Sequence, residues 1–115
     1  MTPDEARTVC IDLDHTLCVS SVGDYAAAHP IDGAAAIIRE LRQSGWIVVI
    51  HTARHFNHWR MTADWLAAHG FEYDQIVFGK PPARFYIDDR AIWYGGDWHA
   101  IAARLREAMA SDSAG

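Results

Sequence analysis

The chain has no long hydrophobic run, and this excludes a membrane-spanning protein. Its 115 residues contain no apolar stretch near the roughly 20 residues that cross a bilayer. The opening MTPDEARTVC carries two acidic residues and lacks the apolar core of a secretion signal. We therefore expect a cytoplasmic protein that does not bind membranes.

Cysteine and positive charge are also scarce. Cys10 and Cys18 are the only cysteines, and two thiols in a chain without a secretion signal favour reduced thiols over a disulfide. Lys and Arg total 10 against 15 Asp and Glu, giving a net charge of -5. The basic residues are scattered, which argues against a nucleic-acid-binding face. A few of them can still bind one phosphate group.

What is present is the composition of one folded domain. Half of the residues are apolar and 22% are charged, and the length suits a single core, so we expect one domain over residues 1–115. Buried strands are predicted at residues 8–13, 46–50, 76–78, 84–87 and 92–94. Helical spacing is predicted from an Asp32 cap to Gly45, over residues 55–69 and over residues 98–109. Residues 18–30 read as a loop or hairpin.

Strands that alternate with helices predict an α/β fold, a Rossmann-like three-layer sandwich with a mostly parallel sheet of four to five strands and no separate cap domain. One conflict is visible in the spacing. Only the sequence GKPP separates the third and fourth predicted strands, whereas a parallel crossover needs a dozen or more residues. The third strand is therefore expected to be short or differently oriented.

Polar residues follow the ends of the predicted strands, where ligands of parallel sheets bind. They are Asp12 and Asp14, His51 and Thr52, Lys80, and the pair Asp88 and Asp89. Clustered carboxylates repel one another unless a cation binds, and Mg2+ prefers carboxylate, water and phosphate oxygens. An acid two residues after a nucleophilic carboxylate can protonate a leaving oxygen and then activate water. A hydroxyl and an ammonium group suit the binding of a phosphoryl group.

The motifs DLDHT (residues 12–16), IHTAR (50–54), GKP (79–81) and YIDDR (86–90) resemble, in order, the four motifs of the haloacid dehalogenase superfamily. The combination of TAR, GKP and IDDRA is similar to small phosphatases of bacterial capsule and surface-sugar biosynthesis. The resemblance implies that Asp12 forms an aspartyl phosphate and that Asp14 is the general acid and base. It also implies that Thr52 and Lys80 hold the phosphoryl group, and that Mg2+ is bound by Asp12, Asp14 through its backbone carbonyl, Asp88 and Asp89. His15 departs from the family, which usually has Gly there.

The segment after the first motif is only as long as a hairpin, so the site is expected to be open. Such proteins either act on bulky substrates or borrow a lid from a second copy, and the sequence leaves both open. We expect the substrate to be a small phosphorylated sugar or a related metabolite. The rim residues that select it are expected to be Asp24, Tyr25, Arg54, His55 and His58.

Other functions are compatible with some of the same residues. Receiver domains use similar residues, but there the acid pair comes first and the lysine last. Phosphoryl transfer to an acceptor other than water, attack on a carbon-halogen bond and a non-catalytic regulatory role of the same fold remain as alternatives. A zinc site of His51, His55 and His58 is disfavoured, because no cysteine or acid lies at matching spacing. Trp93, Tyr94 and Trp98 form an aromatic patch for which core packing is favoured over sugar stacking or a subunit interface.

Overall fold

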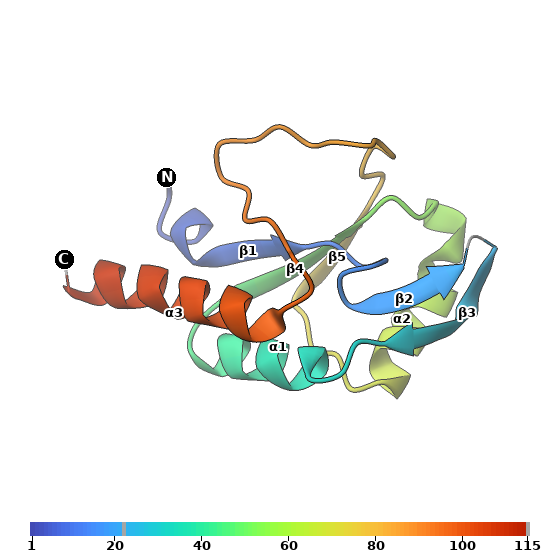
Figure 1. Ribbon diagram of the computed structural model, residues 1–115, viewed down its shortest axis with the longest axis horizontal. Coiled ribbons are helices and arrows are strands. Elements are labelled where there is room, and N and C mark those ends of the chain that lie inside the picture. Colours follow the sequence, from blue (N-terminus) through green and yellow to red (C-terminus); the bar gives the residue numbers. More distant parts are fainter. Residues whose placement is uncertain (22, 115) are drawn as a thin grey trace. The chain divides into compact units, whose positions relative to one another are not determined.

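The computed structural model describes residues 1–21 and 23–114 (Figure 1). It consists of two compact units, Met1–Pro82 and Ala83–Gly115, and each is described by itself. No helix among the described residues is long and apolar enough to cross a membrane. The single domain over residues 1–115 stays a prediction.

A three-stranded parallel sheet forms the centre of the first unit. Its order is β1 (Thr8–Ile11), β4 (Ile47–Thr52) and β5 (Gln75–Phe78), with Ile11 opposite Ile50 and Thr52 opposite Phe78. The middle strand β4 buries Val48 and Ile50 on one face and Val49 on the other, as a strand covered on both faces does. Because all three strands are parallel, their carboxyl ends lie at one edge.

Helix α1 (Ala34–Gln43) packs against β4 through residues at helical spacing. Ala34, Ile37, Ile38 and Leu41 are buried. Ile37 and Leu41 belong to the apolar positions that helical spacing predicts, whereas Ala36, the third of them, is exposed. Asp32 does not cap this helix, however. The residue before the helix is Gly33, whose φ of 82° lies in the left-handed region that glycine adopts without a Cβ clash, and no side chain caps there.

The second helical segment is a short 3-10 turn η2 (Phe56–His58) followed by α2 (Trp59–Ala68). Its buried residues are Thr62, Trp65 and Leu66. The apolar residues Trp59, Ala63, Leu66 and Ala67 recur at helical spacing, but of these Trp59 is exposed and Leu66 is buried. Another 3-10 turn, η1 (Glu5–Arg7), precedes β1.

An antiparallel hairpin follows the first motif, as predicted. It pairs β2 (Cys18–Ser21) with β3 (Asp24–Pro30). The Trp65 indole N–H donates a hydrogen bond of 3.0 Å to the Ala28 carbonyl. Figure 1 shows β3 beside α2, and this bond ties the hairpin to the helix.

The second unit contains α3 (Trp98–Ala114) and an extended segment before it. The predicted strands at 84–87 and 92–94 are wrong, since no described residue there forms a strand. Phe85 and Ile87 are exposed, and the Arg90 N–H donates 2.8 Å to the Asp88 carboxylate in a local turn. A strand needs a partner for its backbone groups, and this unit has no other strand among its described residues.

The aromatic residues near the start of α3 divide in two. Trp98 is buried and its ring centroid lies 5.6 Å from that of Tyr94, as core packing requires. Trp93 is exposed.

The α/β class is confirmed by these strands and helices, whereas the sheet among the described residues has three parallel strands and not four to five.

Candidate active site

Asp12 follows the last residue of β1, at the carboxyl edge of the sheet. Its side chain is 37% exposed, and its Oδ1 lies 3.6 Å from the Lys80 ammonium nitrogen. Lys80 comes two residues after β5, so the pair joins the ends of two strands separated by β4. The structure thus brings the predicted nucleophile and the predicted phosphate-binding lysine together.

Thr52 ends the strand between them and is completely buried. The Lys80 N–H donates 3.1 Å to the Thr52 carbonyl, which fixes the turn that carries the lysine. The Thr52 hydroxyl accepts a bond of 3.1 Å from the Arg54 N–H. A hydroxyl that accepts still has its own proton to donate, so this contact leaves the predicted phosphate-binding role open.

Asp14 has both carboxylate oxygens engaged. The Arg54 Nε donates a hydrogen bond of 2.9 Å to Asp14 Oδ2, and the Arg54 Nη2 donates one of 2.8 Å to Asp14 Oδ1. The Ser20 hydroxyl donates a third hydrogen bond, of 2.5 Å, to Asp14 Oδ1. Burial by itself raises the pKa of Asp14, but the bonds from Arg54 and Ser20 and the charge of Arg54 outweigh it. The pKa of Asp14 therefore lies below its ordinary value, and the group is held as a carboxylate.

Arg54 is not a rim residue, and that prediction is wrong. It is only 3% exposed, and besides Asp14 it donates 3.3 Å to the Thr62 hydroxyl. The Tyr25 ring covers the guanidinium at 4.1 Å. Arg54 is thus a buried group that connects β4 and α2 with Asp14 and the hairpin.

The sequence contains a signal for this pair. Arg54 lies two residues beyond the end of one strand, and Asp14 lies at a similar distance beyond the neighbouring strand. Opposite charges at equivalent positions of adjacent parallel strands favour an ion pair.

His15 adopts a left-handed backbone conformation with φ of 63°. Its N–H donates 2.7 Å to the Cys18 carbonyl, which closes the turn into the hairpin. This conformation costs an L-residue roughly 1–2 kcal/mol. The departure from the glycine usual in the resembling family therefore falls at a position where the backbone favours glycine.

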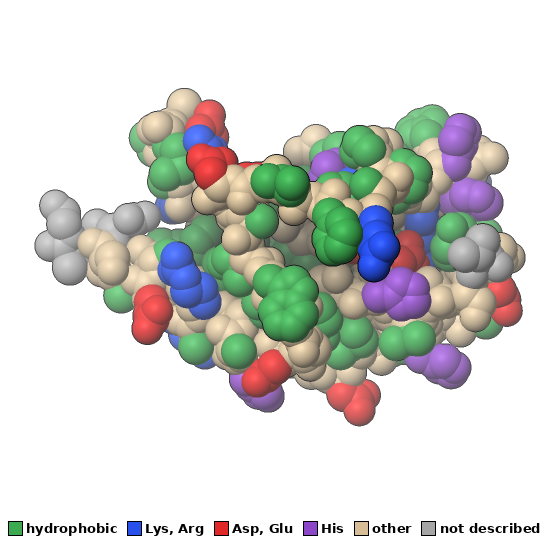
Figure 2. Space-filling model, turned by 45° about the horizontal axis from the view of Figure 1, so that its top comes forward, with side chains coloured by type: hydrophobic (Ala, Val, Ile, Leu, Met, Phe, Trp, Pro, Cys, Tyr) green, Lys and Arg blue, Asp and Glu red, His purple; other side chains and the backbone are tan. Residues whose placement is uncertain are grey.

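The remaining predicted rim residues come from the hairpin and η2. Asp24 and His55 are exposed, while Tyr25 and His58 are half-buried with ring centroids 5.5 Å apart. The His55 Nδ1 accepts 3.1 Å from the Asn57 N–H at the start of η2. In Figure 2 most visible histidine side chains lie at the right, over the hairpin and the start of α2.

Cys18 borders the same network. It is buried, and its Sγ lies 3.7 Å from Asp14 Oδ1. Burial and the Asp14 charge raise the pKa of the thiol to about 11. A thiol with this pKa stays protonated at neutral pH, so Cys18 is not a nucleophile.

The predicted metal ligands are divided between the two units, with Asp88 and Asp89 exposed in the second. Within each unit, no three His, Cys, Asp or Glu side chains among the described residues gather closely enough to hold a metal. The Asp14 carboxylate does not suit Mg2+, because Arg54 and Ser20 occupy it. Its carbonyl oxygen and the Asp12 carboxylate are of the hard oxygen type that Mg2+ prefers.

A cavity of about 620 Å³ lies beside Lys80, between the loop that follows β4 and the edge strand β5. Residues 53–56 form one wall, and residues 75–80 with Pro82 form the other. Sequence reasoning did not find this cavity, because it depends on how η2 approaches β5.

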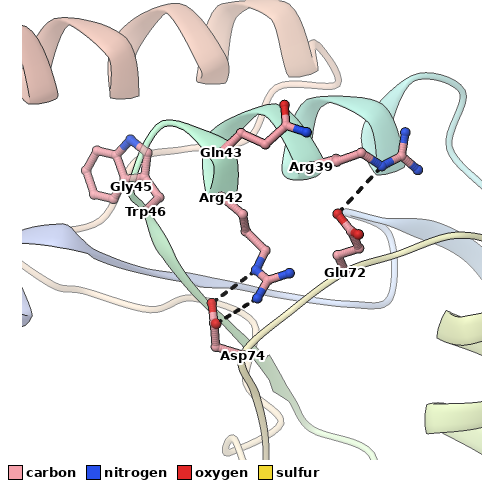
Figure 3. Close-up of a pocket in the computed structure, with 7 residues that line it drawn as sticks. All are labelled: Arg39, Arg42, Gln43, Gly45, Trp46, Glu72 and Asp74. Atoms are coloured by element: carbon pink, nitrogen blue, oxygen red, sulfur yellow. Dashed lines mark hydrogen bonds and ion pairs between the residues drawn. The ribbon is translucent and has the colours of Figure 1, made fainter.

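A second cavity, of about 380 Å³, lies near the amino ends of β4 and β5, at the edge of the sheet opposite Thr52 (Figure 3). Arg42 reaches across it, with its Nη2 2.9 Å from Asp74 Oδ1. The Arg39 Nε lies 3.6 Å from Glu72 Oε2. The Asp74 carboxylate also accepts 2.8 Å from the Val48 N–H. These contacts fasten α1 and the chain before β5 to the sheet and leave no free cation for a ligand.

Comparisons with known proteins give structural neighbours only. No family model matches the chain, and no curated protein matches it. An MCSG target protein from Vibrio cholerae is similar in its crystal structure, with 27% identity and a TM-score of 0.70, over 92% of this chain and 98% of that one. A chain of a Pnkp1/Rnl/Hen1 complex has 22% identity and a TM-score of 0.54 over 71% of this chain, and the match spans 30% of that chain.

Proposed function

We propose that the chain is a Mg2+-dependent phosphate monoester hydrolase of the haloacid dehalogenase superfamily, which works through a phosphorylated Asp12. The observation that carries this proposal is the pair of Asp12 and Lys80. A solvent-accessible carboxylate at a strand end can attack phosphorus, and an ammonium 3.6 Å away offsets the charge of the phosphoryl oxygens.

Two half-reactions follow from these groups. Asp12 attacks phosphorus, the bond from phosphorus to the leaving oxygen breaks, and that oxygen takes a proton from Asp14. Asp14 then removes a proton from a water molecule, which attacks the phosphorus and releases phosphate from Asp12. The bonds from Arg54 and Ser20 favour the carboxylate form, which the second step needs. The first step requires that Asp14 has taken up a proton against this preference.

The proposed metal ligands are the Asp12 carboxylate, the Asp14 carbonyl oxygen, Asp88 and Asp89. Bound Mg2+ supplies positive charge that neutralises the phosphoryl oxygens. The three-layer arrangement of the superfamily is part of this proposal.

The substrate is proposed to be a small phosphorylated metabolite. Asp24, Tyr25, His55 and His58 remain candidates for contacts with its leaving group, whereas Arg54 does not. A phosphorylated sugar stays a prediction, as does a second copy of the chain that covers the open site.

An aryl phosphate assay tests the proposal. Phosphate release should require Mg2+, stop with chelator and be abolished by Asp12→Asn. Asp64→Asn is a matched control, because Asp64 is an exposed aspartate on α2 away from the strand ends, and it should keep wild-type turnover. Normal turnover by Asp12→Asn, or full activity in chelator, would contradict the proposal.

A further inference from the structure

The cavity and the candidate phosphoryl site share Lys80, which lines the cavity and also contacts Asp12. Its volume of about 620 Å³ is within the range of small-molecule sites. From Gln75 to Phe78 its wall follows β5 for three residue steps, which is roughly 10 Å. A ligand with its phosphate at Lys80 therefore has room for a leaving group along β5.

The walls of this cavity are mostly apolar and aromatic. Phe56 and Phe78 meet edge to face with centroids 5.8 Å apart, and Phe56 is 66% exposed, so much of its ring surface is open. Pro82 adds a further apolar surface. Exposed aromatic rings bind other flat rings by stacking.

Four polar side chains are among the described residues that line the cavity. Lys80 is at one end of the β5 wall and Gln75 is at the other, while Arg54 and His55 belong to the opposite wall. No carboxylate is among the described residues that line it, and the nearest one named here is Asp12, 3.6 Å from the Lys80 ammonium nitrogen. This distribution suits a flat ring with a few polar edge atoms better than a sugar ring covered with hydroxyls, which would leave many hydroxyls without partners.

We propose that this cavity binds a flat aromatic ring carried by the leaving group, so that the preferred substrates are phosphate esters with such a ring, either a nucleobase or a phenol. The leaving-group role rests on the proposed function, whereas ring binding can be measured without it. The ring stacks on Phe56 while the phosphate lies at Lys80.

Binding calorimetry in the Asp12→Asn background tests this with three phosphate esters: adenosine monophosphate, phenyl phosphate and ribose 5-phosphate. Stacking on an aromatic side chain is expected to make at least one ring-bearing ester bind roughly tenfold more tightly than ribose 5-phosphate. Phe56→Ala should remove that difference, and Phe56→Tyr should keep it. Tight binding of adenosine monophosphate alone indicates a nucleobase, and equal binding of phenyl phosphate indicates that the ring suffices.

Trp59→Ala is the matched control, because Trp59 is an exposed aromatic three residues away that does not line the cavity. It should leave all affinities unchanged, and inorganic phosphate should bind equally to wild type and Phe56→Ala. Should Phe56→Ala fold poorly, Phe56→Leu removes the ring and keeps apolar volume.

Ribose 5-phosphate binding as tightly as both ring-bearing esters would overturn the ring assignment, and so would equal effects of Phe56→Ala and Trp59→Ala. Ring-dependent binding without hydrolysis by the wild-type chain would leave the cavity assignment standing and reject the enzyme. Hydrolysis without ring preference would support the enzyme and overturn the cavity assignment.

Discussion

Replacing Arg54 by methionine should destabilise the first unit strongly, because it removes the buried partner of Asp14. The Arg54 side chain is 1% exposed and that of Asp14 is 24% exposed. Removing one member of a buried ion pair costs about 3–5 kcal/mol. Asp14 keeps the Ser20 bond and some contact with water, so we expect a loss of about 2–3 kcal/mol in the free energy of unfolding.

A double-mutant cycle isolates the pair from the other effects of each substitution. Arg54→Met, Asp14→Ala and the double variant would be compared with wild type by urea unfolding. We expect a coupling free energy of about 2 kcal/mol, since two charge-assisted bonds join the groups.

The structure contains a matched pair for comparison. Arg42 and Asp74 form the same two-bond contact, at 3.3 and 2.9 Å, but their side chains are 33% and 37% exposed. Solvent screening should reduce their coupling to below about 1 kcal/mol. If the coupling of Arg54 with Asp14 is no larger than that of Arg42 with Asp74, burial does not set the strength of the pair and the reasoning fails.

Three further predictions concern pH, backbone strain and metal. The hydrogen bond from Arg42 and then that from Val48 lower the pKa of Asp74, so its contribution is present above the unfolded pKa of about 3.9 and is lost as pH falls through the folded value. Asp74→Asn should therefore lower the free energy of unfolding at neutral pH by up to about 1 kcal/mol. The variant should also lose less of its free energy of unfolding than wild type as the pH falls into the acid range, and an equal loss in both would contradict this. His15→Gly should raise the free energy of unfolding by about 0.5–1 kcal/mol in urea, because φ of 63° suits glycine, and a loss of stability would refute the strain. Saturating Mg2+ should raise the Tm of wild type and not of Asp12→Asn, whereas equal shifts would place the metal elsewhere.

Much of the first unit follows from local sequence patterns. Most of WIVVI lies in the buried strand β4 because a continuous apolar run suits a strand covered on both faces. Ile37 and Leu41 lie on the buried face of α1, as helical spacing predicts. Asp12 and Lys80 meet because parallel strands end at one edge of the sheet. Those features depend on neighbours in sequence and on one topological rule.

Other features depend on partners that periodicity does not specify. Residues 84–87 have the apolar content of a strand, but forming one requires a neighbouring strand for its backbone groups. Arg54 is expected at the rim among groups that can hydrogen-bond sugar hydroxyls, and its burial follows from its contacts with Asp14 and with Tyr25 of the hairpin. The start of α1 at Gly33 reflects the path of the preceding chain, which overrides the capping preference of Asp32.

The most direct test of the central claim is chemical trapping of the phosphorylated residue. Wild-type chain would be mixed with an aryl phosphate and Mg2+, quenched during turnover and treated with borohydride, which reduces an aspartyl phosphate to homoserine. Peptide mass spectrometry should then find homoserine at position 12, and none in Asp12→Asn. Homoserine at another aspartate, or none at all while phosphate is released, would contradict Asp12 as the nucleophile.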